Sequence, residues 1–417
     1  MKDSGIEWIG KVPVEWKIDN PQYHFSQRKD RAKQGMVQLT ASQKYGVITQ
    51  TEYMERTGAN IVTVQKDFDI LKLVCAGDFV IHMRSFQGGL EYSEKTGSIS
   101  SAYVMLIPSN TIREPRYYKW FFKSSNYIDA LSSTSNLVRD GQAMRWSNFI
   151  QLPILFPPAE EQQRIADFLD AKCAEIDALT ADIQTQIDTL EQYKRSVITE
   201  TVTKGLNPDA EMKDSGIEWV GKMPLAWDAV PNKYLMYKVK NICPVYNGED
   251  ILSLTTNGVI IRDLNGGGKM PTSFDGYQKV TPGNLLMCLF DIDVTPRCIG
   301  LVKNFGLTSP AYSQFVMRTG AYAPYYYYYY LMVDYTKELL HMAKNLRHSL
   351  TEDQLGAIKA PNPPYEEQVQ IAEFLDKKCV EINLVIEDKN RQLATLDEYK
   401  KSLIFEYVTG KKEVPTS

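Results

Sequence analysis

The stretch Pro157-Pro158-Ala159-Glu160-Glu161-Gln162 occurs again, 206 residues later, as Pro363-Pro364-Tyr365-Glu366-Glu367-Gln368. Between 157–177 and 363–383, fourteen of twenty-one positions are identical, and the register then continues without a gap to Gly205 and Lys411. Another duplicated stretch lies earlier in each half of the chain. Segment 2–11 returns as 213–222 with nine of ten residues identical, and Trp16 returns as Trp227. Two matches in the same order indicate an internal duplication, which determines the architecture.

Each Pro-Pro-x-Glu-Glu-Gln stretch predicts the start of a long helix. Proline ends the preceding segment because it fixes φ and supplies no donor, and the two glutamates complement the dipole of the first turn. Apolar residues then recur every seven positions, the period of a coiled-coil seam. At 1.5 Å per residue, each helix would be roughly 60–65 Å long. The expected seam residues are Leu169, Ile176, Ile183, Leu190 and Val197 in the first helix and Leu375, Ile382, Leu393, Leu396 and Leu403 in the second.

We expect the two helices to pair with each other. The alternative is that each helix packs separately on its own domain.

The two divergent middle segments are expected to share a mixed α/β fold. Strand-like runs occur at Gly77–Met83 and Gly283–Leu289, again 206 residues apart, and turn signals occur at 45–47 and 257–259. An aromatic segment follows in each half, at 116–122 and at the hexatyrosine run 325–330. We expect these segments to be helices that face the core, and stacking of the rings on nucleic-acid bases is the alternative.

The chain divides by these repeats into six segments. They are a leader (1–16), a first middle segment (17–156), a helix with its linker (157–211), a repeated leader (212–227), a second middle segment (228–362) and a second helix (363–417).

The composition is that of a globular protein, with 43% hydrophobic and 24% charged residues and a net charge of −4. No apolar run is long enough to cross a membrane, and an acidic residue lies where a signal peptide would be apolar, so we expect a cytoplasmic protein. Six cysteines without a CxxC pair and only four histidines predict neither a disulfide framework nor a metal site.

The charge differs between segments. Residues 17–155 contain 17 basic and 12 acidic side chains, and 228–362 contain 13 and 11. The helical segments are acidic, with 5 basic and 12 acidic residues in 156–211 and 8 and 11 in 363–417. Binding of phosphates would therefore belong to the middle segments, and the isolated chain should bind DNA weakly.

Motifs for catalysis are not supported. Asn362-Pro363-Pro364-Tyr365 matches the loop of amino-group DNA methyltransferases, but no glycine-rich turn for S-adenosylmethionine precedes it. No nucleotide-binding GxxxxGK[ST] loop and no GxSxG elbow occurs. We therefore expect a binding and scaffolding chain, with no catalytic, cofactor-binding or metal-binding residues.

The duplicated plan resembles the specificity subunit of type I restriction–modification systems. Residues 5–16 and 216–227 are similar to that family's G-x-x-W-x-G-x-x-P-x-x-W opening, and the Pro-Pro-x-Glu-Glu-Gln stretches are similar to the start of its helices. The resemblance covers the whole chain. It implies an α+β fold with an internal pseudo-twofold repeat, in which two long antiparallel coiled-coil helices separate two similar mixed α/β target recognition domains.

The resemblance also implies a function. Each recognition domain would read one half of a bipartite, asymmetric site in double-stranded DNA, and the helices would set the spacer. Two methyltransferase subunits, and restriction and motor subunits, would dock on this chain. S-adenosylmethionine, ATP and Mg²⁺ are expected in those partners and not in this chain. A stand-alone methyltransferase using Asn362-Pro363-Pro364-Tyr365 and a tandem-domain DNA-binding regulator are the alternatives.

Candidate DNA-reading residues lie in loops after strand-like runs or between elements, where binding groups concentrate. Arg, Lys, Asn and Gln are the side chains that most often read base edges in the major groove. The candidates are Gln43, Lys44, Tyr45, Arg84, Ser85, Gln87, Arg139 and Gln142 in the first middle segment and Thr256, Asn257, Thr295, Arg297, Asn345, Arg347 and His348 in the second.

Overall fold

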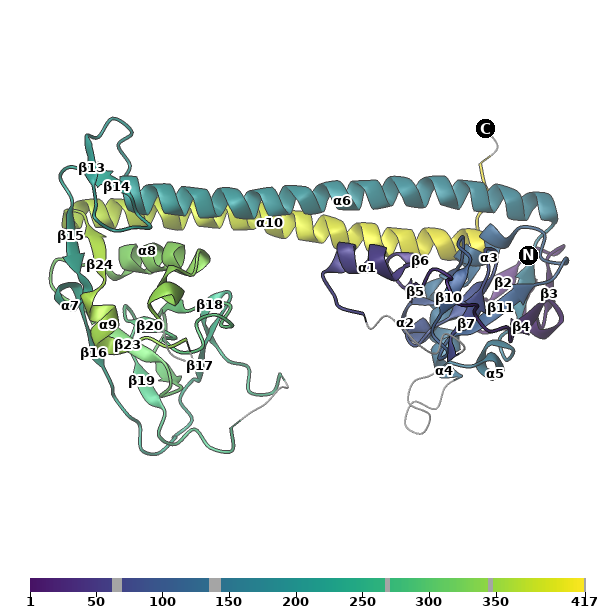
Figure 1. Cartoon of the computed structure of the whole chain (residues 1–417), viewed down its shortest axis with the longest axis horizontal. Coiled ribbons are helices and arrows are strands. Elements are labelled where there is room, and N and C mark those ends of the chain that lie inside the picture. Colours follow the sequence, from purple (N-terminus) through teal and green to yellow (C-terminus); the bar gives the residue numbers. More distant parts are fainter. Residues whose placement is uncertain (62–69, 135–143, 267–270, 344–347, 416–417) are drawn as a thin grey trace. The chain divides into compact units, whose positions relative to one another are not determined.

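The computed structural model describes residues 1–61, 70–134, 144–266, 271–343 and 348–415. The chain forms two compact units (Figure 1). Unit 1 contains Met1–Ile183 and Arg391–Ser417, and unit 2 contains Gln184–Asn390. Each unit therefore combines one leader and one middle segment with the beginning of one long helix and the end of the other.

The two long helices begin and end close to the positions that the sequence predicts. Helix α6 spans Ala159–Lys204, with 46 residues, and α10 spans Tyr365–Val408, with 44 residues. Both follow the proline pair directly and have two glutamates in the first turn. Gly205, with φ +76°, follows the last residue of α6, as expected for a helix that ends on a left-handed glycine.

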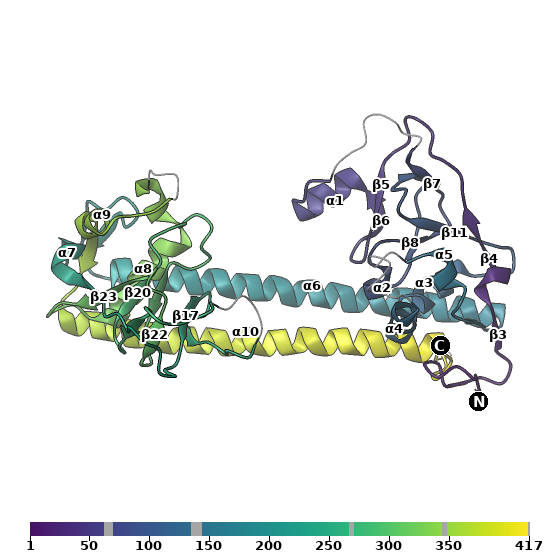
Figure 2. The ribbon, with the colours of Figure 1, turned by 90° about the horizontal axis from the view of Figure 1, so that it is seen from below.

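Within each unit the two helices lie side by side and run antiparallel (Figures 1 and 2). In unit 1, Lys400 pairs with Asp177 at 2.5 Å, and the ring centroids of Phe168 and Tyr407 are 4.4 Å apart. In unit 2, Lys194 Nζ donates to Asn383 Oδ1 at 3.0 Å. The helices therefore pair with each other, as expected. Among the expected seam residues, Leu169, Ile176, Ile183, Leu375, Ile382 and Leu403 are buried, and Leu190, Val197, Leu393 and Leu396 are half-buried.

A four-stranded antiparallel sheet with the same strand order forms the centre of each unit. The order is β4-β11-β8-β9 in unit 1 and β16-β23-β20-β21 in unit 2. Strands β8 and β20 are buried along their whole length and lie 206 residues apart, which confirms the predicted strand pair. The bounds are Phe25–Arg28, Val104–Pro108, Phe79–Ile81 and Glu91–Tyr92 in unit 1, and Met236–Val239, Ser313–Met317, Leu285–Met287 and Ile299–Leu301 in unit 2.

Two-stranded antiparallel ladders accompany each sheet, in matching sets. Unit 1 contains β1-β2 (Lys2–Asp3, Lys11–Val12), β12-β3 (Ile154–Phe156, Lys17–Asp19), β5-β6 (Leu39–Ser42, Gly46–Thr49) and β10-β7 (Gly97–Ile99, Lys72–Val74). Unit 2 contains β13-β14 (Met212–Asp214, Lys222–Pro224), β15-β24 (Asp228–Pro231, Lys359–Asn362), β17-β18 (Leu252–Thr255, Gly258–Ile261) and β19-β22 (Gln278–Val280, Gly306–Thr308). The middle segments thus share one fold, as the repeat predicts.

The aromatic segments form helices α3 (Pro115–Phe121) and α8 (Ala323–Tyr335), which lie between the sheet and the long helices of their units (Figures 1 and 2). Tyr325, Tyr326, Tyr328, Tyr329 and Tyr330 are all buried. The expectation of a core-facing aromatic helix is confirmed, because rings that are buried in this way cannot stack on bases.

The shorter helices are α1 (Gln50–Thr57), α2 (Ser85–Gly88), α4 (Ser125–Ser133), α5 (Trp146–Phe149), α7 (Asn232–Leu235), α9 (Glu352–Ala357) and the 3₁₀ turns Pro21–Tyr23 and Glu338–Met342.

The leaders bind the first turns of the long helices. The fully buried Trp16 donates its indole N–H to Glu161 Oε2 at 2.8 Å in unit 1, and Trp227 donates to Glu367 Oε2 at 3.0 Å in unit 2. The glutamine of each motif donates to the carbonyl of its first proline at 2.8 Å. These contacts explain why the Glu-Gln pair and a tryptophan occur together in both repeats.

The aromatic helices bind the opposite helix ends. Tyr117 donates to the main-chain carbonyl of Val408 at 2.7 Å in unit 1, and Tyr325 donates to that of Val202 at 3.0 Å in unit 2. These carbonyls lie in the last turn, where no helical partner is available, so the buried hydroxyls satisfy them. Each unit therefore holds the start of one long helix and the end of the other.

We predict that Gly410→Ala lowers the stability of the full chain more than Gly58→Ala does. Both glycines follow a helix and have nearly the same φ, +66° and +67°. A Cβ at Gly58 meets nothing within 4 Å, whereas one at Gly410 would lie 2.6 Å from Pro13 Cδ and 2.9 Å from Trp16 Cη2. The expected losses are about 1 kcal/mol at Gly58 from the left-handed backbone and about 2–4 kcal/mol at Gly410, where overpacking adds to it. Urea unfolding measures both, and equal losses would contradict this account of the helix end.

Candidate nucleic-acid interface

The structure brings together two of the candidate segments in unit 1. The β5–β6 turn contains Gln43, Lys44 and Tyr45, and Gln43 Nε2 donates to the main-chain carbonyl of Arg84 at 3.0 Å. A Cβ at Gly88 would lie 2.5 Å from Gln43 Cγ, so the turn lies directly on loop 84–88, which contains α2. The two segments thus form one surface.

The candidates of loop 84–88 differ in exposure. Arg84 and Gln87 are exposed, which leaves both side chains free to approach a base edge. Ser85 is fully buried, and its Oγ accepts the main-chain N–H of His82 at 2.9 Å. Ser85 therefore supports the loop from inside and does not belong to the exposed surface, because its hydroxyl is enclosed and already bonded. Arg139 and Gln142 lie outside the described residues.

Helix α1 adds residues to this surface that the sequence analysis missed. The Arg56 guanidinium lies 5.2 Å and Lys44 Nζ 5.3 Å from the ring centroid of Tyr45, and Tyr53 meets the same ring edge-on. Arg56 also pairs with Glu52 at 2.5 Å. The signal in the sequence was weak, since segment 50–57 is polar and its helix buries no residue.

In unit 2, loop 291–297 is joined to the segment that contains His348. His348 Nδ1 lies 2.9 Å from Asp293 Oδ2, and the main-chain N–H of Ile292 donates to the His348 carbonyl at 3.3 Å. Hydrogen bonding to His348 lowers the pKa of Asp293, so this carboxylate stays charged beside the imidazole. Asn345 and Arg347 lie outside the described residues.

The other candidates of unit 2 differ in orientation. Thr256 and Asn257 are exposed at the turn of the β17–β18 hairpin. Thr295 and Arg297 are half-buried. Burial raises the pKa of Tyr327 and of Tyr335. The positive charge of Arg297 opposes this shift at both tyrosines, so the Arg297 guanidinium lies near α8. Arg297 stays a candidate for DNA reading, at a half-buried position.

Several cations of unit 1 are bonded within the protein and cannot neutralise phosphates. The Arg28 guanidinium binds the buried carboxylate of Asp78 at 2.7 and 2.9 Å, and this bond raises the pKa of Arg28. Arg116 binds the carboxylate of Glu114, the residue before α3, and those of Asp167 and Asp170 in α6, at 2.9–3.1 Å. The positive charge available to DNA in unit 1 is thus smaller than the residue count suggests.

Asn362, the first residue of the motif that matches a methyltransferase loop, is hydrogen-bonded within the fold of unit 2. Its Oδ1 accepts the Tyr326 hydroxyl at 2.8 Å and Gln368 Nε2 at 3.2 Å. The residue ends β24 directly before the prolines that start α10. The motif thus belongs to the junction between strand and helix, and nothing favours the catalytic alternative. Over the described ranges, no group of His, Cys, Asp and Glu side chains could hold a metal ion.

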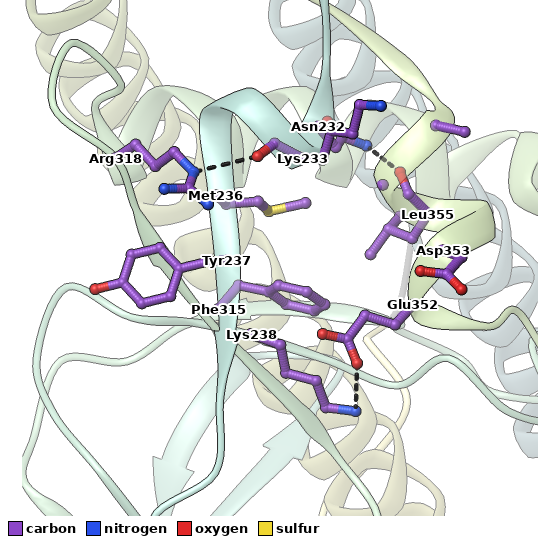
Figure 3. A pocket seen from close by; sticks show the side chains of 12 residues that line it. Asn232, Lys233, Met236, Tyr237, Lys238, Phe315, Arg318, Glu352, Asp353 and Leu355 are labelled. Atoms are coloured by element: carbon purple, nitrogen blue, oxygen red, sulfur yellow. Dashed lines mark hydrogen bonds and ion pairs between the residues drawn. The ribbon is translucent and has the colours of Figure 1, made fainter.

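A pocket of about 430 Å³ lies in unit 2 beside α7, β16 and α9 (Figure 3). Lys238 pairs with Glu352 at 3.3 Å on its rim, and Arg318 Nε donates to the carbonyl of Lys233 at 3.2 Å. Asp353 adds a further negative charge. Lys238 and Arg318 are thus bonded to neighbouring groups, while Lys233 also lines the pocket. Its floor is apolar and is formed by Met236, Phe315 and Leu355.

No helix in the described part of the chain is both long and apolar enough to span a membrane.

Comparisons with known proteins agree with the duplicated plan. The family model of the type I restriction modification DNA specificity domain matches residues 24–189. Two curated relatives from Methanocaldococcus jannaschii align over nearly the full length. The type I restriction enzyme MjaVIII specificity subunit is 23% identical, over 97% of this chain and 94% of the relative. The putative type I restriction enzyme MjaX specificity subunit is 23% identical, over 98% and 96%.

Solved structures share the fold. A chain from work on the complex assembly and conformational transition of the type I R-M system gives a TM-score of 0.68 at 13% identity, covering 96% of this chain and all of the other. The HsdS subunit from Thermoanaerobacter tengcongensis gives 0.51 at 14%, covering 99% of this chain and all of that subunit. The family model over 24–189, the two relatives aligned over nearly the full length and the shared duplicated fold together support the identification of this chain as a type I restriction–modification specificity subunit.

Proposed function

We propose that this chain supplies the DNA sequence specificity of its enzyme and carries out no catalysis itself. Each unit would read one half of a bipartite, asymmetric site through the surface around loop 84–88 or loop 291–297. The observation that carries this proposal is the contrast between the two units. They share sheet order and helix-end contacts but present different side chains in the loops, as two readers of unlike half-sites require.

Partner subunits would carry the chemistry. We propose that two methyltransferase subunits, and restriction and motor subunits, dock on this chain and contain the sites for S-adenosylmethionine, ATP and Mg²⁺. The similarity to type I restriction–modification specificity subunits supports this division of roles. Nothing favours a stand-alone methyltransferase or a tandem-domain regulator.

Exposed apolar residues at equivalent repeat positions support docking of two copies of one partner. Leu179 and Tyr399 in unit 1, and Val385 and Tyr193 in unit 2, are between 46% and 54% exposed. Glu175 and, to a smaller extent, Tyr399 raise the pKa of Lys172, so Tyr399 lies near Lys172. Leu179 follows Lys172 by seven residues and therefore lies on the same face of α6. Lys378 has the same relation to Glu381 and Tyr193. Large apolar side chains left exposed in matching pairs are typical of a partner surface.

We also propose that the long helices set the spacer between half-sites. Unit 1 holds the start of α6 through Glu161, and unit 2 holds its end through Val202. The helical residues between these two contacts would then determine the distance. Lengthening α6 alone would shift its seam against α10, so a test has to lengthen both helices.

The first test addresses the half-sites. Arg84→Ala should lower discrimination at one half-site by roughly 1–3 kcal/mol at the affected base pair and leave the other half unchanged. Asn257→Ala should affect only the opposite half. Sequencing of methylated sites in cells that express the chain with its partners gives both motifs. Arg113→Ala, an exposed arginine in the turn before α3, is the control. Equal effects of Arg84→Ala on both halves, with the protein folded, would exclude separate readers.

The second test addresses the spacer. Seven helix-forming residues inserted between Ile183 and Gln184, and seven between Asn390 and Arg391, preserve the seam period and add about 10 Å. At roughly 3.4 Å per base pair, the spacer should grow by about three base pairs while both half-sequences stay the same. The same insertion after Asn207, beyond the end of α6, should leave the spacer unchanged. Methylation confined to the original spacing in the double insertion would refute the role of the helices.

The third test addresses docking. Leu179→Asp with Tyr399→Asp should remove one methyltransferase copy from the purified complex, and Val385→Asp with Tyr193→Asp should remove the other. A charge placed in an apolar contact is desolvated without a partner. Native mass spectrometry counts the copies, and Val245→Asp, at an exposed position in a loop of unit 2, serves as the control. Complexes that retain both copies in all variants would place docking elsewhere.

A further inference from the structure

Backbone strain is concentrated around loop 291–297. Among the residues that the structure describes, the non-glycine residues with positive φ are Asp291 (+48°), Lys337 (+55°) and His348 (+41°). Asp291 opens the loop, His348 pairs with Asp293 within it, and Lys337 Nζ donates to the carbonyl of Thr295 at 2.7 Å. Such conformations persist only where the surroundings hold them, and they cluster at functional sites.

Lys337 links this loop to the core of unit 2. Its Nζ also binds Asp334 Oδ1 at 2.7 Å, and the other oxygen of this buried carboxylate accepts the main-chain N–H of Cys298 at 2.9 Å. Burial lowers the pKa of Lys337, but the bond to Asp334 outweighs it and the pKa is raised. The ammonium group therefore stays charged and continues to donate to the loop.

Unit 1 contains the same arrangement with different residues. Lys123 Nζ donates to the carbonyl of Gly88, the last residue of α2, at 2.9 Å, and it also binds the carboxylate of Glu91, which is buried. The adjoining backbone is closely packed, since a Cβ at Gly89 would lie 2.0 Å from the Phe122 carbonyl oxygen. The end of loop 84–88 is thus held in the same way as Thr295 is in unit 2.

The two lysines lie at matching places after the aromatic helices, but the offset of 206 residues between the repeats does not align them. Each lies two residues beyond the end of its aromatic helix, α3 at Phe121 and α8 at Tyr335. The register of 206 would instead place Lys123 opposite Tyr329. The helices differ in length, with 7 and 13 residues, yet the contact from lysine to loop carbonyl and buried carboxylate is present in both units.

We propose that Lys123 and Lys337 are positioning residues for DNA recognition, each fixing the loop that reads the half-site of its own unit. The inference rests on the proposed function of these loops. Neither lysine needs to touch DNA. Each holds a loop carbonyl and thereby the direction in which the loop presents its exposed side chains, so the loss of one lysine should change base preference in one half-site only.

The test uses the full chain in complex with its methyltransferase and a library of DNA with randomised half-sites. Lys123→Met keeps the length of the side chain and removes the donor. It should reduce discrimination at one or more base pairs of one half-site at least roughly fivefold. Lys337→Met should do so in the opposite half. Lys123→Arg, which retains a donor, should preserve most of the discrimination in its half.

Three further variants separate positioning from general destabilisation. Lys123→Met with Glu91→Gln removes the carboxylate that would otherwise be buried without a cation, and it should still relax the same half-site. Lys400→Met and Lys194→Met remove ion-paired lysines of similar exposure from the long helices. They should leave both half-sites unchanged.

The outcomes are distinguishable. Unchanged base preference in folded Lys123→Met and Lys337→Met, or equal relaxation of both half-sites by either one, would overturn the inference. A wild-type complex that selects no bipartite sequence would overturn the proposed function itself.

Discussion

The binding of both ends of each long helix is the constraint on which the rest of this structure depends. A helix leaves main-chain carbonyls without partners in its last turn, and its first turn carries the partial positive charge of free N–H groups. A helix of more than forty residues with a narrow apolar seam has to satisfy both ends. The leader tryptophans donate to glutamates in the first turns, and Tyr117 and Tyr325 donate to carbonyls in the last turns. The tyrosine contacts are buried and the tryptophan contacts are partly buried, so a unit that lost one would leave a poorly solvated polar group without a partner.

This arrangement separates the frame of the protein from its readers. The frame consists of the seam, the helix ends and the central sheets, and it is nearly the same in the two units. The loops at 84–88 and 291–297 differ in sequence, although a lysine binds a carbonyl of each loop. With this separation, the loops of either unit can change without altering the long helices and the sheets that form the frame.

Electrostatics follow the same division. The long helices are acidic, and several cations of the first recognition domain are bonded to internal carboxylates, as Arg28 is to Asp78. The charge that remains for phosphates is modest, so affinity for DNA would depend on the assembled enzyme. At the loops, by contrast, charged side chains fix the position of the main chain. Lys123 and Lys337 bind buried carboxylates and main-chain carbonyls at once.

The sequence by itself determined the duplication, the two long helices, their seam and the family. Local signals suffice for these features, because proline, first-turn glutamates and a seven-residue period act within a few turns of chain. It also predicted strand-like runs at 77–83 and 283–289, which contain the observed strands Phe79–Ile81 and Leu285–Met287. Only the tertiary structure decided which candidate side chains are available for reading. Ser85 is enclosed, Arg297 lies near α8, and Arg56 joins Tyr45 from a helix that the sequence did not indicate. Lys123 and Lys337 make similar contacts from positions that the repeat register does not align, because the helices before them differ in length. No pattern along the chain records a contact of that kind.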